Sequence, residues 1–163
     1  MSNNGATLID HTDFEKFPNE PYNGWVTKNV GWKLERKTDA GDTFLKFKED
    51  SEGPMLAQLL EKPFRGLIIG RKYRLEVRTK ALVVPNAHPT RLEFRRKGGA
   101  DWFLRGASVT NPLWHIVEGT FTADAAEETL NIDVSNGWDP ELPYSKKFYY
   151  PAFYSIELYL EPA

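Results

Sequence analysis

The side chains best suited to chemistry in this sequence are aromatic rings with polar neighbours. Trp102 follows a pair of glycines in a strongly polar stretch, and Trp138 and Tyr144 lie in a Gly- and Pro-rich segment at residues 136–145. Such rings are harder to explain as core, and a flat apolar ring is what the C–H face of a pyranose stacks on. We interpret these three rings as candidate ligand-binding residues, with Tyr22 as a weaker candidate.

A second candidate feature is polar alternation along three segments that read as strands. If these strands share one sheet, their outward side chains form a polar floor whose charged groups make strong, directional hydrogen bonds to sugar hydroxyls. The alternative is a solvated face whose opposite charges pair across strands, each pair contributing about 0.2–1 kcal/mol. From this floor we select as ligand-binding candidates Glu76, Arg78, Glu93, Arg95 and Asp133.

Patterns for catalysis are weak. The sequence has no Gly-x-Ser-x-Gly elbow, no His-Glu-x-x-His and no phosphate-binding loop. Glu76, Glu93 and Asp133 offer the paired carboxylates that a glycosidase needs, but their separation cannot be read from a sequence. The absence of cysteine excludes disulfides and thiolate metal sites, and three widely spaced histidines do not form a zinc motif. We therefore expect a protein that is not an enzyme, with a glycosidase-like activity as the alternative.

The charge balance limits the classes of partner. A formal net charge of −2 gives no overall attraction to nucleic acid or to an anionic membrane, so neither is expected as a partner. The short basic run at residues 95–97, near Trp102 and Arg105, favours at most an acidic polysaccharide. The polar opening residues are not typical of a signal peptide, and no apolar run has the length of a membrane span. These features fit a cytoplasmic protein or a module of an exported one.

Many short alternating segments, separated by turn residues, predict an all-β sandwich or barrel. No amphipathic helix is evident, and the apolar segment at residues 55–60 is too short between its flanking prolines for a helix, so we predict a strand there. We expect one domain over residues 1–163, with residues 1–6 flexible. A closing strand at residues 148–160 is predicted to turn Tyr154, Ile156 and Leu158 inward.

The order of several landmarks along the chain resembles that of carbohydrate-binding modules of families 4, 9 and 22. These modules are jelly-roll sandwiches of the galactose-binding-like group, and the resemblance extends from Leu8 to Leu160. The landmarks are Asp13-Phe14-Glu15, Asn23-Gly24-Trp25, residues 41–47, Leu56-Ala57-Gln58-Leu59-Leu60, Gly70-Arg71-Lys72-Tyr73, Trp114 ahead of residues 118–122, and residues 153–158.

This resemblance implies a non-catalytic jelly roll of two antiparallel sheets that binds an oligosaccharide or polysaccharide. It also implies core positions for Trp25 and Trp114, and a structural Ca²⁺ held in part by Glu15. Ser155 stands where the family pattern has a carboxylate, so the turn that ends at Asp42 would have to supply oxygen ligands. The alternative is a structural or protein-interaction sandwich without a glycan ligand, serving a protein partner or a parent multidomain protein.

Overall fold

The computed structural model describes residues 5–28, 34–47, 56–82, 88–97, 101–135 and 148–163. These residues form strands and turns, and none of them belongs to a helix that could cross a membrane. The strands are β1 (Thr7–Asp13), β2 (Val26–Thr27), β3 (Leu34–Asp39), β4 (Asp42–Phe47), β5 (Leu56–Phe64), β6 (Lys72–Leu82), β7 (His88–Arg96), β8 (Asp101–Val109), β9 (His115–Thr122), β10 (Glu128–Ser135) and β11 (Phe148–Leu160).

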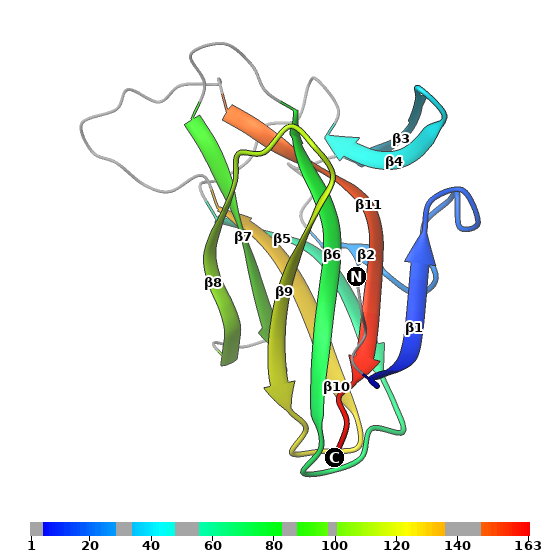
Figure 1. Ribbon diagram of the computed structural model, residues 1–163, viewed down its shortest axis with the longest axis vertical. Helices are drawn as coiled ribbons and strands as arrows, with labels where there is room; N and C mark the ends of the chain where they lie inside the picture. Colours follow the sequence, from blue (N-terminus) through cyan, green and yellow to red (C-terminus); the bar gives the residue numbers. More distant parts are fainter. Residues whose placement is uncertain (1–4, 29–33, 48–55, 83–87, 98–100, 136–147) are drawn as a thin grey trace.

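The strands form two antiparallel sheets that pack against each other (Figure 1). The first sheet contains β1, β3, β4, β6, β9 and β11, with the long β11 hydrogen-bonded to β1, β4 and β6. The second sheet runs β2-β5-β10-β7-β8. The first two residues of β11 also pair in parallel with the start of β7, which joins the sheets along one edge. The prediction of an all-β sandwich is confirmed.

Alternation along the strands creates one core between the sheets. Tyr73, Leu75 and Val77 of β6 face Leu130 and Ile132 of β10 across it, and all five side chains are buried. Burying a side chain of this size contributes about 1.5–3 kcal/mol relative to leaving it exposed. The hydrophobic pattern therefore determines which side of each strand faces the core and which side carries the polar residues.

The segment between Pro54 and Pro63 is a strand, as predicted, and it extends through Pro63 to Phe64 as β5. The strand pairs with β10 along its whole length but with β2 only at Leu60 and Glu61. Pro63 lies past that short pairing, where a missing N–H is tolerated.

The closing strand β11 is present, but Tyr154 is not in the core as predicted. The register of β11 with β6 shifts between Phe153 and Ser155, which marks a β-bulge. The extra residue puts Phe153 into the core and leaves Tyr154 half-buried against Trp114. Strict alternation fails there because a bulge breaks the two-residue period.

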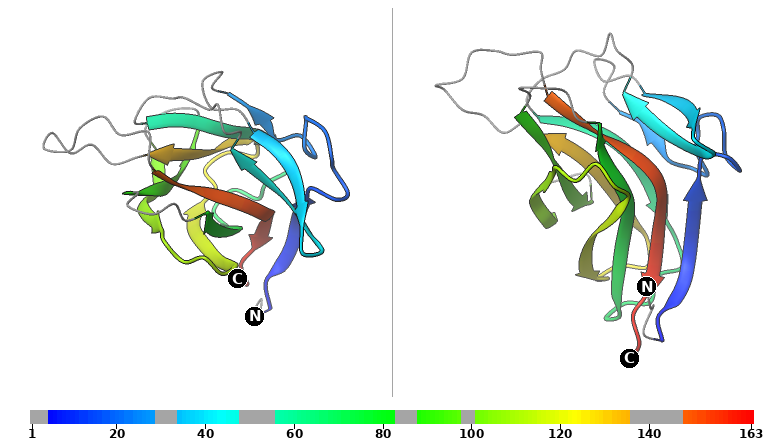
Figure 2. Two further views of the ribbon diagram at one scale, coloured as in Figure 1. Left: turned by 90° about the horizontal axis from the view of Figure 1, so that it is seen from above. Right: turned by 45° about the horizontal axis from the view of Figure 1, so that its top comes forward.

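β8, the last strand of the second sheet, lies close to β9, the last strand of the first sheet (Figure 2). Gly119 of β9 permits this approach: a Cβ there would lie 3.1 Å from Leu104 Cβ and from the Phe103 carbonyl oxygen. A larger residue would push β8 away from the core. This contact fixes the position of the strand that carries Trp102.

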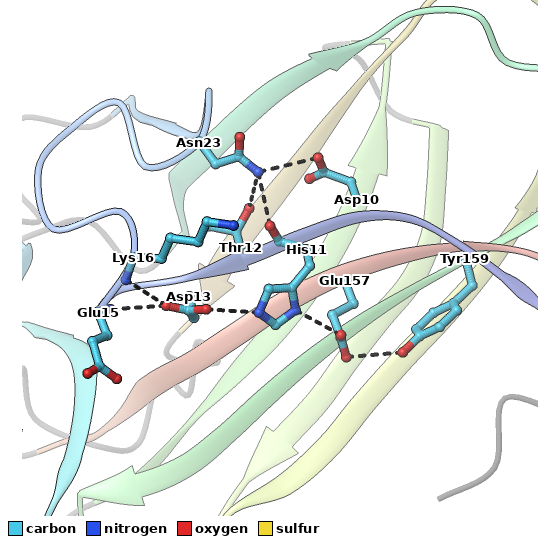
Figure 3. A network of polar contacts seen from close by, with 9 residues as sticks. All are labelled: Asp10, His11, Thr12, Asp13, Glu15, Lys16, Asn23, Glu157 and Tyr159. Carbon is cyan, nitrogen blue, oxygen red and sulfur yellow. Dashed lines mark hydrogen bonds and ion pairs between the residues drawn. The ribbon is translucent and has the colours of Figure 1, made fainter.

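The start of the chain is held on the sandwich by side chains. The Asn23 amide donates to Asp10, to the Thr12 hydroxyl and to the His11 carbonyl, which ties the loop after β1 back onto that strand (Figure 3). Lys62 of β5 adds an ion pair to Asp10 at 3.0 Å. Of the segment expected to be flexible, residues 5 and 6 are described, and Ala6 is buried.

Candidate functional site

The polar floor predicted from the sequence is divided between the two sheets. Glu76 and Arg78 lie on β6 in the first sheet, whereas Glu93 and Arg95 on β7 and Asp133 on β10 belong to the second. The prediction of one shared floor is therefore wrong. Alternation identifies the side of a strand that faces away from the core, but it does not say to which sheet the strand belongs.

The outer side of the second sheet carries a compact polar group, which we name the arginine face. Cross-strand pairing sets Asp133 opposite Glu93 and Asn131 opposite Arg95, while the intervening Leu92 and Phe94 of β7 enter the core. The arginine face comprises Arg91, Glu93, Arg95, Trp102, Arg105, Asn131 and Asp133.

At the centre of the arginine face is a buried ion pair. Arg95 Nε lies 2.5 Å from Asp133 Oδ2, and the two side chains are only 7% and 1% exposed. Burial raises the pKa of Asp133, opposed by the hydrogen bond and charge of Arg95 and reinforced by the charges of Glu93 and Glu61. Because a buried charge needs a partner, this pair is a fixed part of the sheet.

An irregularity in β8 brings Trp102 and Arg105 to the same side. Simple alternation would place them on opposite sides of the strand. The register with β7 shifts at Phe103 and again near Gly106, whose φ of +70° suits glycine. As a result, the guanidinium carbons of Arg95 and Arg105 lie 5.2 and 4.9 Å from the centre of the Trp102 ring.

The outer part of the arginine face is accessible. Arg105 has a side chain that is 68% exposed, and its Nε lies 3.7 Å from Glu93 Oε2, beyond hydrogen-bonding distance. Arg91 is exposed and lies above Gly106, 4.0 Å from where a Cβ would stand. Trp102 is half-buried beside Arg105. The face thus has a buried network in the middle and two exposed arginines at its β8 side.

Asn131 lies at the β5 side of the same face. Its amide nitrogen donates to Glu61 at 2.8 Å, while its buried Oδ1 accepts no hydrogen bond from the residues that the structure describes. A buried acceptor without a partner is destabilising.

The basic run at residues 95–97 is neutralised within the protein. Arg96 reaches Asp101 at 2.5 Å and Glu128 at 2.6 Å, and Lys97 reaches Asp124 at 2.6 Å. With Arg95 paired to Asp133, every cation of the run has an acidic partner. The run therefore offers no concentrated positive charge to a polyanion.

The outer side of the first sheet carries a second polar group, the histidine face, which comprises His11, Asp13, Arg74, Glu76, Glu157 and Tyr159 (Figure 3 shows four of these residues). His11 bridges Glu157 and Asp13, with both contacts at 2.9 Å. Burial lowers the pKa of His11, but the hydrogen bonds to Glu157 and Asp13 raise it by a larger amount. The pKa of His11 therefore lies above its ordinary value.

Arg74 completes the histidine face. It donates to Glu76 at 2.6 Å, is ion-paired with Glu161, and lies 4.8 Å over the ring of Tyr159. Burial, together with the charges of Glu157 and Glu76, raises the pKa of Tyr159 to about 12. These groups are bonded to one another, which is the arrangement expected of a structural network.

The aromatic candidates have mixed outcomes. Trp25 is fully buried in the core, as expected, but Trp114 is half-buried outside it, with its indole N–H donating to Asp42 and Lys80 lying 4.6 Å over its ring. Tyr22 is buried edge-on against Phe14, so it is not a surface ring. The remaining two candidates, Trp138 and Tyr144, lie outside the described residues.

The two residues predicted to bind calcium, Glu15 and Asp42, lie in different surroundings. The Glu15 side chain is exposed and points away from the network in Figure 3, and the Asp42 carboxylate accepts the Trp114 indole N–H at 3.1 Å. Within the described ranges, no three His, Asp or Glu side chains come together as a metal cluster. Calcium favours six to eight oxygen ligands. A calcium site at Glu15 and Asp42 stays a prediction.

Pairing of carboxylates for glycosidase chemistry is restricted by the fold. Glu76 lies on a different sheet from Glu93 and Asp133, so it cannot pair with either. Glu93 and Asp133 are direct cross-strand neighbours, but Asp133 is 1% exposed and bonded to Arg95. A substrate oxygen cannot reach that carboxyl group, which disfavours it as a general acid.

The selection of site residues from the sequence omitted Arg91 and Arg105. Arg91 lies in the same alternating segment as two selected residues, and the pattern places it on the predicted polar floor although it was not selected. Arg105 reaches the face only because of the irregularities in β8, and Gly106 is the one local signal of them.

Searches with whole sequences found no match: no family model matches the chain, and no curated protein is similar to it in sequence. Solved structures do match. One is a CBM22 xylan-binding domain of Paenibacillus barcinonensis Xyn10C, with a TM-score of 0.59 and 13% identity over 97% of each chain. The chain has the fold of a carbohydrate-binding module.

Two further structures agree. TmCBM61, solved with β-1,4-galactotriose, matches with a TM-score of 0.60 and 13% identity over 92% of this chain and 95% of that chain. The CBM22-1 and GH10 modules of Clostridium thermocellum xylanase 10B, solved with xylohexaose, match with a TM-score of 0.59 and 15% identity, covering 96% of this chain and 29% of that one. The jelly-roll resemblance seen in the sequence is confirmed at the level of fold.

Proposed function

We propose that this chain is a non-catalytic carbohydrate-binding module that binds an oligosaccharide or polysaccharide at the arginine face. The observation that carries the proposal is the composition of that face. A half-buried indole, Trp102, stands beside a buried carboxylate network and an exposed arginine, Arg105, on a fold shared with sugar-binding modules.

The chemistry of the face suits a polyhydroxylated ligand. Glu93 supplies acceptor oxygens, Arg91 and Arg105 supply N–H donors, and the exposed part of the Trp102 ring supplies an apolar surface for sugar C–H groups. A hydrogen bond to a charged group contributes about 1.5–3 kcal/mol, so a few of them give measurable affinity. The buried pair of Arg95 and Asp133 holds the sheet beneath these groups.

The proposal does not include every ligand-binding residue that was predicted from the sequence. Glu76 and Arg78 are not included, because they belong to the opposite sheet. Trp138 and Tyr144 remain predicted ligand residues, and the predicted calcium would act as a structural ion rather than as part of the sugar site. The neighbours that match over their full length are binding modules, which supports a role without catalysis.

Affinity electrophoresis through gels that contain single polysaccharides tests the proposal. The panel is xylan, mixed-linkage glucan, galactan, glucomannan, polygalacturonate and alginate. We expect at least one polymer to retard the protein, and Trp102→Ala to abolish the retardation while Trp114→Phe keeps it, because Trp114 packs against the first sheet. No retardation by any polymer, or equal retardation of Trp102→Ala, would favour a protein-interaction domain without a glycan ligand.

A further inference from the structure

We infer that the ligand of the arginine face is an anionic glycan, whose carboxylate or sulfate groups are bound by Arg91 and Arg105. This inference rests on the proposed function, since it names the class of glycan for the same face.

The first argument is the charge balance of the exposed part of the face. Arg95 and Asp133 neutralise each other beneath it. Of the remaining charges, Glu93 is the acid nearest to Arg105, at 3.7 Å, and no acidic partner of Arg91 lies among the residues that the structure describes. The exposed part of the face therefore carries two arginines and the one largely buried carboxylate of Glu93, an excess of positive charge in a protein of net charge −2.

The second argument is the role of Trp102. The guanidinium of Arg105 lies over its ring, with 4.9 Å between the guanidinium carbon and the ring centre. A guanidinium that lies over an aromatic ring makes this contact without using its N–H groups as donors to a carboxylate, so they stay available to a ligand. Trp102 thus holds an exposed arginine with its donors available. That geometry suits the bidentate binding of a carboxylate or sulfate.

The third argument is the contrast with other cations of the molecule. Arg74 and Arg96 each have two or more carboxylate partners, at least one of them within hydrogen-bonding distance. On the arginine face, Arg105 has only the longer contact to Glu93. Arg74 and Arg96 are thus saturated, whereas Arg105 is left unsaturated beside the half-buried indole of this face.

Matched pairs of polymers test the inference, because each pair differs only in its charged groups. The pairs are polygalacturonate with its carboxyl-reduced galactan, and dextran sulfate with dextran. We expect the wild-type protein to bind the charged member at least tenfold more tightly in 20 mM NaCl, and the preference to decrease as salt is raised. The two pairs separate a carboxylate ligand from a sulfate ligand.

Variants assign the preference to particular residues. Arg105→Gln and Arg91→Gln should each weaken binding of the charged polymer about tenfold, the loss of one charge-assisted contact. Arg65→Gln is the matched control, since Arg65 is an arginine with an 82% exposed side chain, paired with Glu127 away from the face. Trp102→Phe should keep most of the affinity, while Trp102→Ala should lose it with Arg105 still present.

The outcomes separate this inference from the proposed function. Equal or tighter binding of the neutral members overturns the anionic ligand and leaves the carbohydrate module standing, whereas no binding of any glycan overturns both. Equal loss in Arg65→Gln would show that only overall charge matters. Binding of single-stranded DNA as tightly as of the charged polymers would replace the glycan by a general polyanion and would also overturn the inference.

Discussion

The two outer faces of the sandwich share several residue types but differ in how completely their charges are paired. On the histidine face, Arg74 is bonded to Glu76 and Glu161, and His11 bridges Asp13 and Glu157. On the arginine face, the buried pair of Arg95 and Asp133 is equally saturated, but Arg91 and Arg105 beside it are not. Arg105 is also next to an indole ring, and under the proposed function this combination distinguishes the binding surface from the structural one.

This difference shows what residue composition leaves out. Opposite charges on neighbouring strands stabilise a sheet modestly when they pair, and they bind ligands when the pairing is incomplete. Incomplete pairing depends on the register of the strands and on local irregularities. The comparison therefore rests on three measurable differences between the faces: in stability, in binding and in titration.

The largest effect is expected at the buried pair beneath the arginine face. Asp133→Ala leaves Arg95 buried without its carboxylate, so the free energy of unfolding should fall by about 3 kcal/mol. Urea unfolding followed by tryptophan fluorescence measures this value. Replacing both residues, as Arg95→Met with Asp133→Leu, should recover most of the loss because neither member of the pair is left buried without its partner. A loss below about 1 kcal/mol in the single variant would mean that the pair does not hold the sheet.

An intermediate effect is expected from one matched substitution on each face. Glu76→Gln weakens the hydrogen bond to Arg74 on the histidine face and should lower the free energy of unfolding by about 1–2 kcal/mol, with glycan binding unchanged. Glu93→Gln removes a carboxylate that has only a 3.7 Å contact to Arg105. The free energy of unfolding of Glu93→Gln should therefore differ from that of the wild type by less than about 0.5 kcal/mol.

Binding gives the opposite order for the same two variants. Glu93→Gln keeps one acceptor oxygen but removes a negative charge next to Arg105, so affinity for a charged glycan should increase about threefold. Isothermal titration with polygalacturonate measures the change. If Glu76→Gln altered affinity as much as Glu93→Gln did, the two faces would not differ in function.

Much of the fold could be predicted because it depends on the two-residue period. The inward residues of β6, β7 and β10 alternate without interruption, and all of them are in the core. The prediction of a strand at residues 55–60 holds for the same reason, because the neighbouring prolines leave no length for a helix. Burial of apolar surface is a property of each strand by itself, so one sequence is enough to find it.

The candidate site could be predicted only in part because it depends on relations between strands. Glu93, Arg95, Trp102 and Asp133 do lie on one face, but the sequence also grouped Glu76 and Arg78 with them, on the wrong sheet. Arg105 joins the face through the irregular register of β8, and Tyr154 leaves the core through the bulge in β11. Each of these departures changes the side of one residue, which a periodic pattern cannot show.

The smallest expected effect is a pH dependence of stability that comes from the histidine face alone. Burial lowers the pKa of His11 but the hydrogen bonds to Glu157 and Asp13 raise it above 6.5, so the folded state favours the protonated ring. The resulting stabilisation is complete below pH 6.5, the value for the unfolded chain, and is lost as pH rises through the folded-state pKa. Because the His11 side chain is 40% exposed, solvent screening limits the loss to a few tenths of a kcal/mol.

Comparison of wild type with His11→Gln at pH 5.5 and pH 8.5 isolates this contribution, because groups common to both proteins cancel. Burial raises the pKa of Asp13, but hydrogen bonds from the Lys16 amide and from His11 lower it by more, so Asp13 titrates below pH 5.5. The difference in unfolding free energy between the two proteins should be present at pH 5.5 and absent at pH 8.5, and an NMR titration of His11 should have its midpoint above 6.5. A midpoint at or below 6.5 would show that the carboxylates do not hold the ring, so that the histidine face would be as unsaturated as the arginine face.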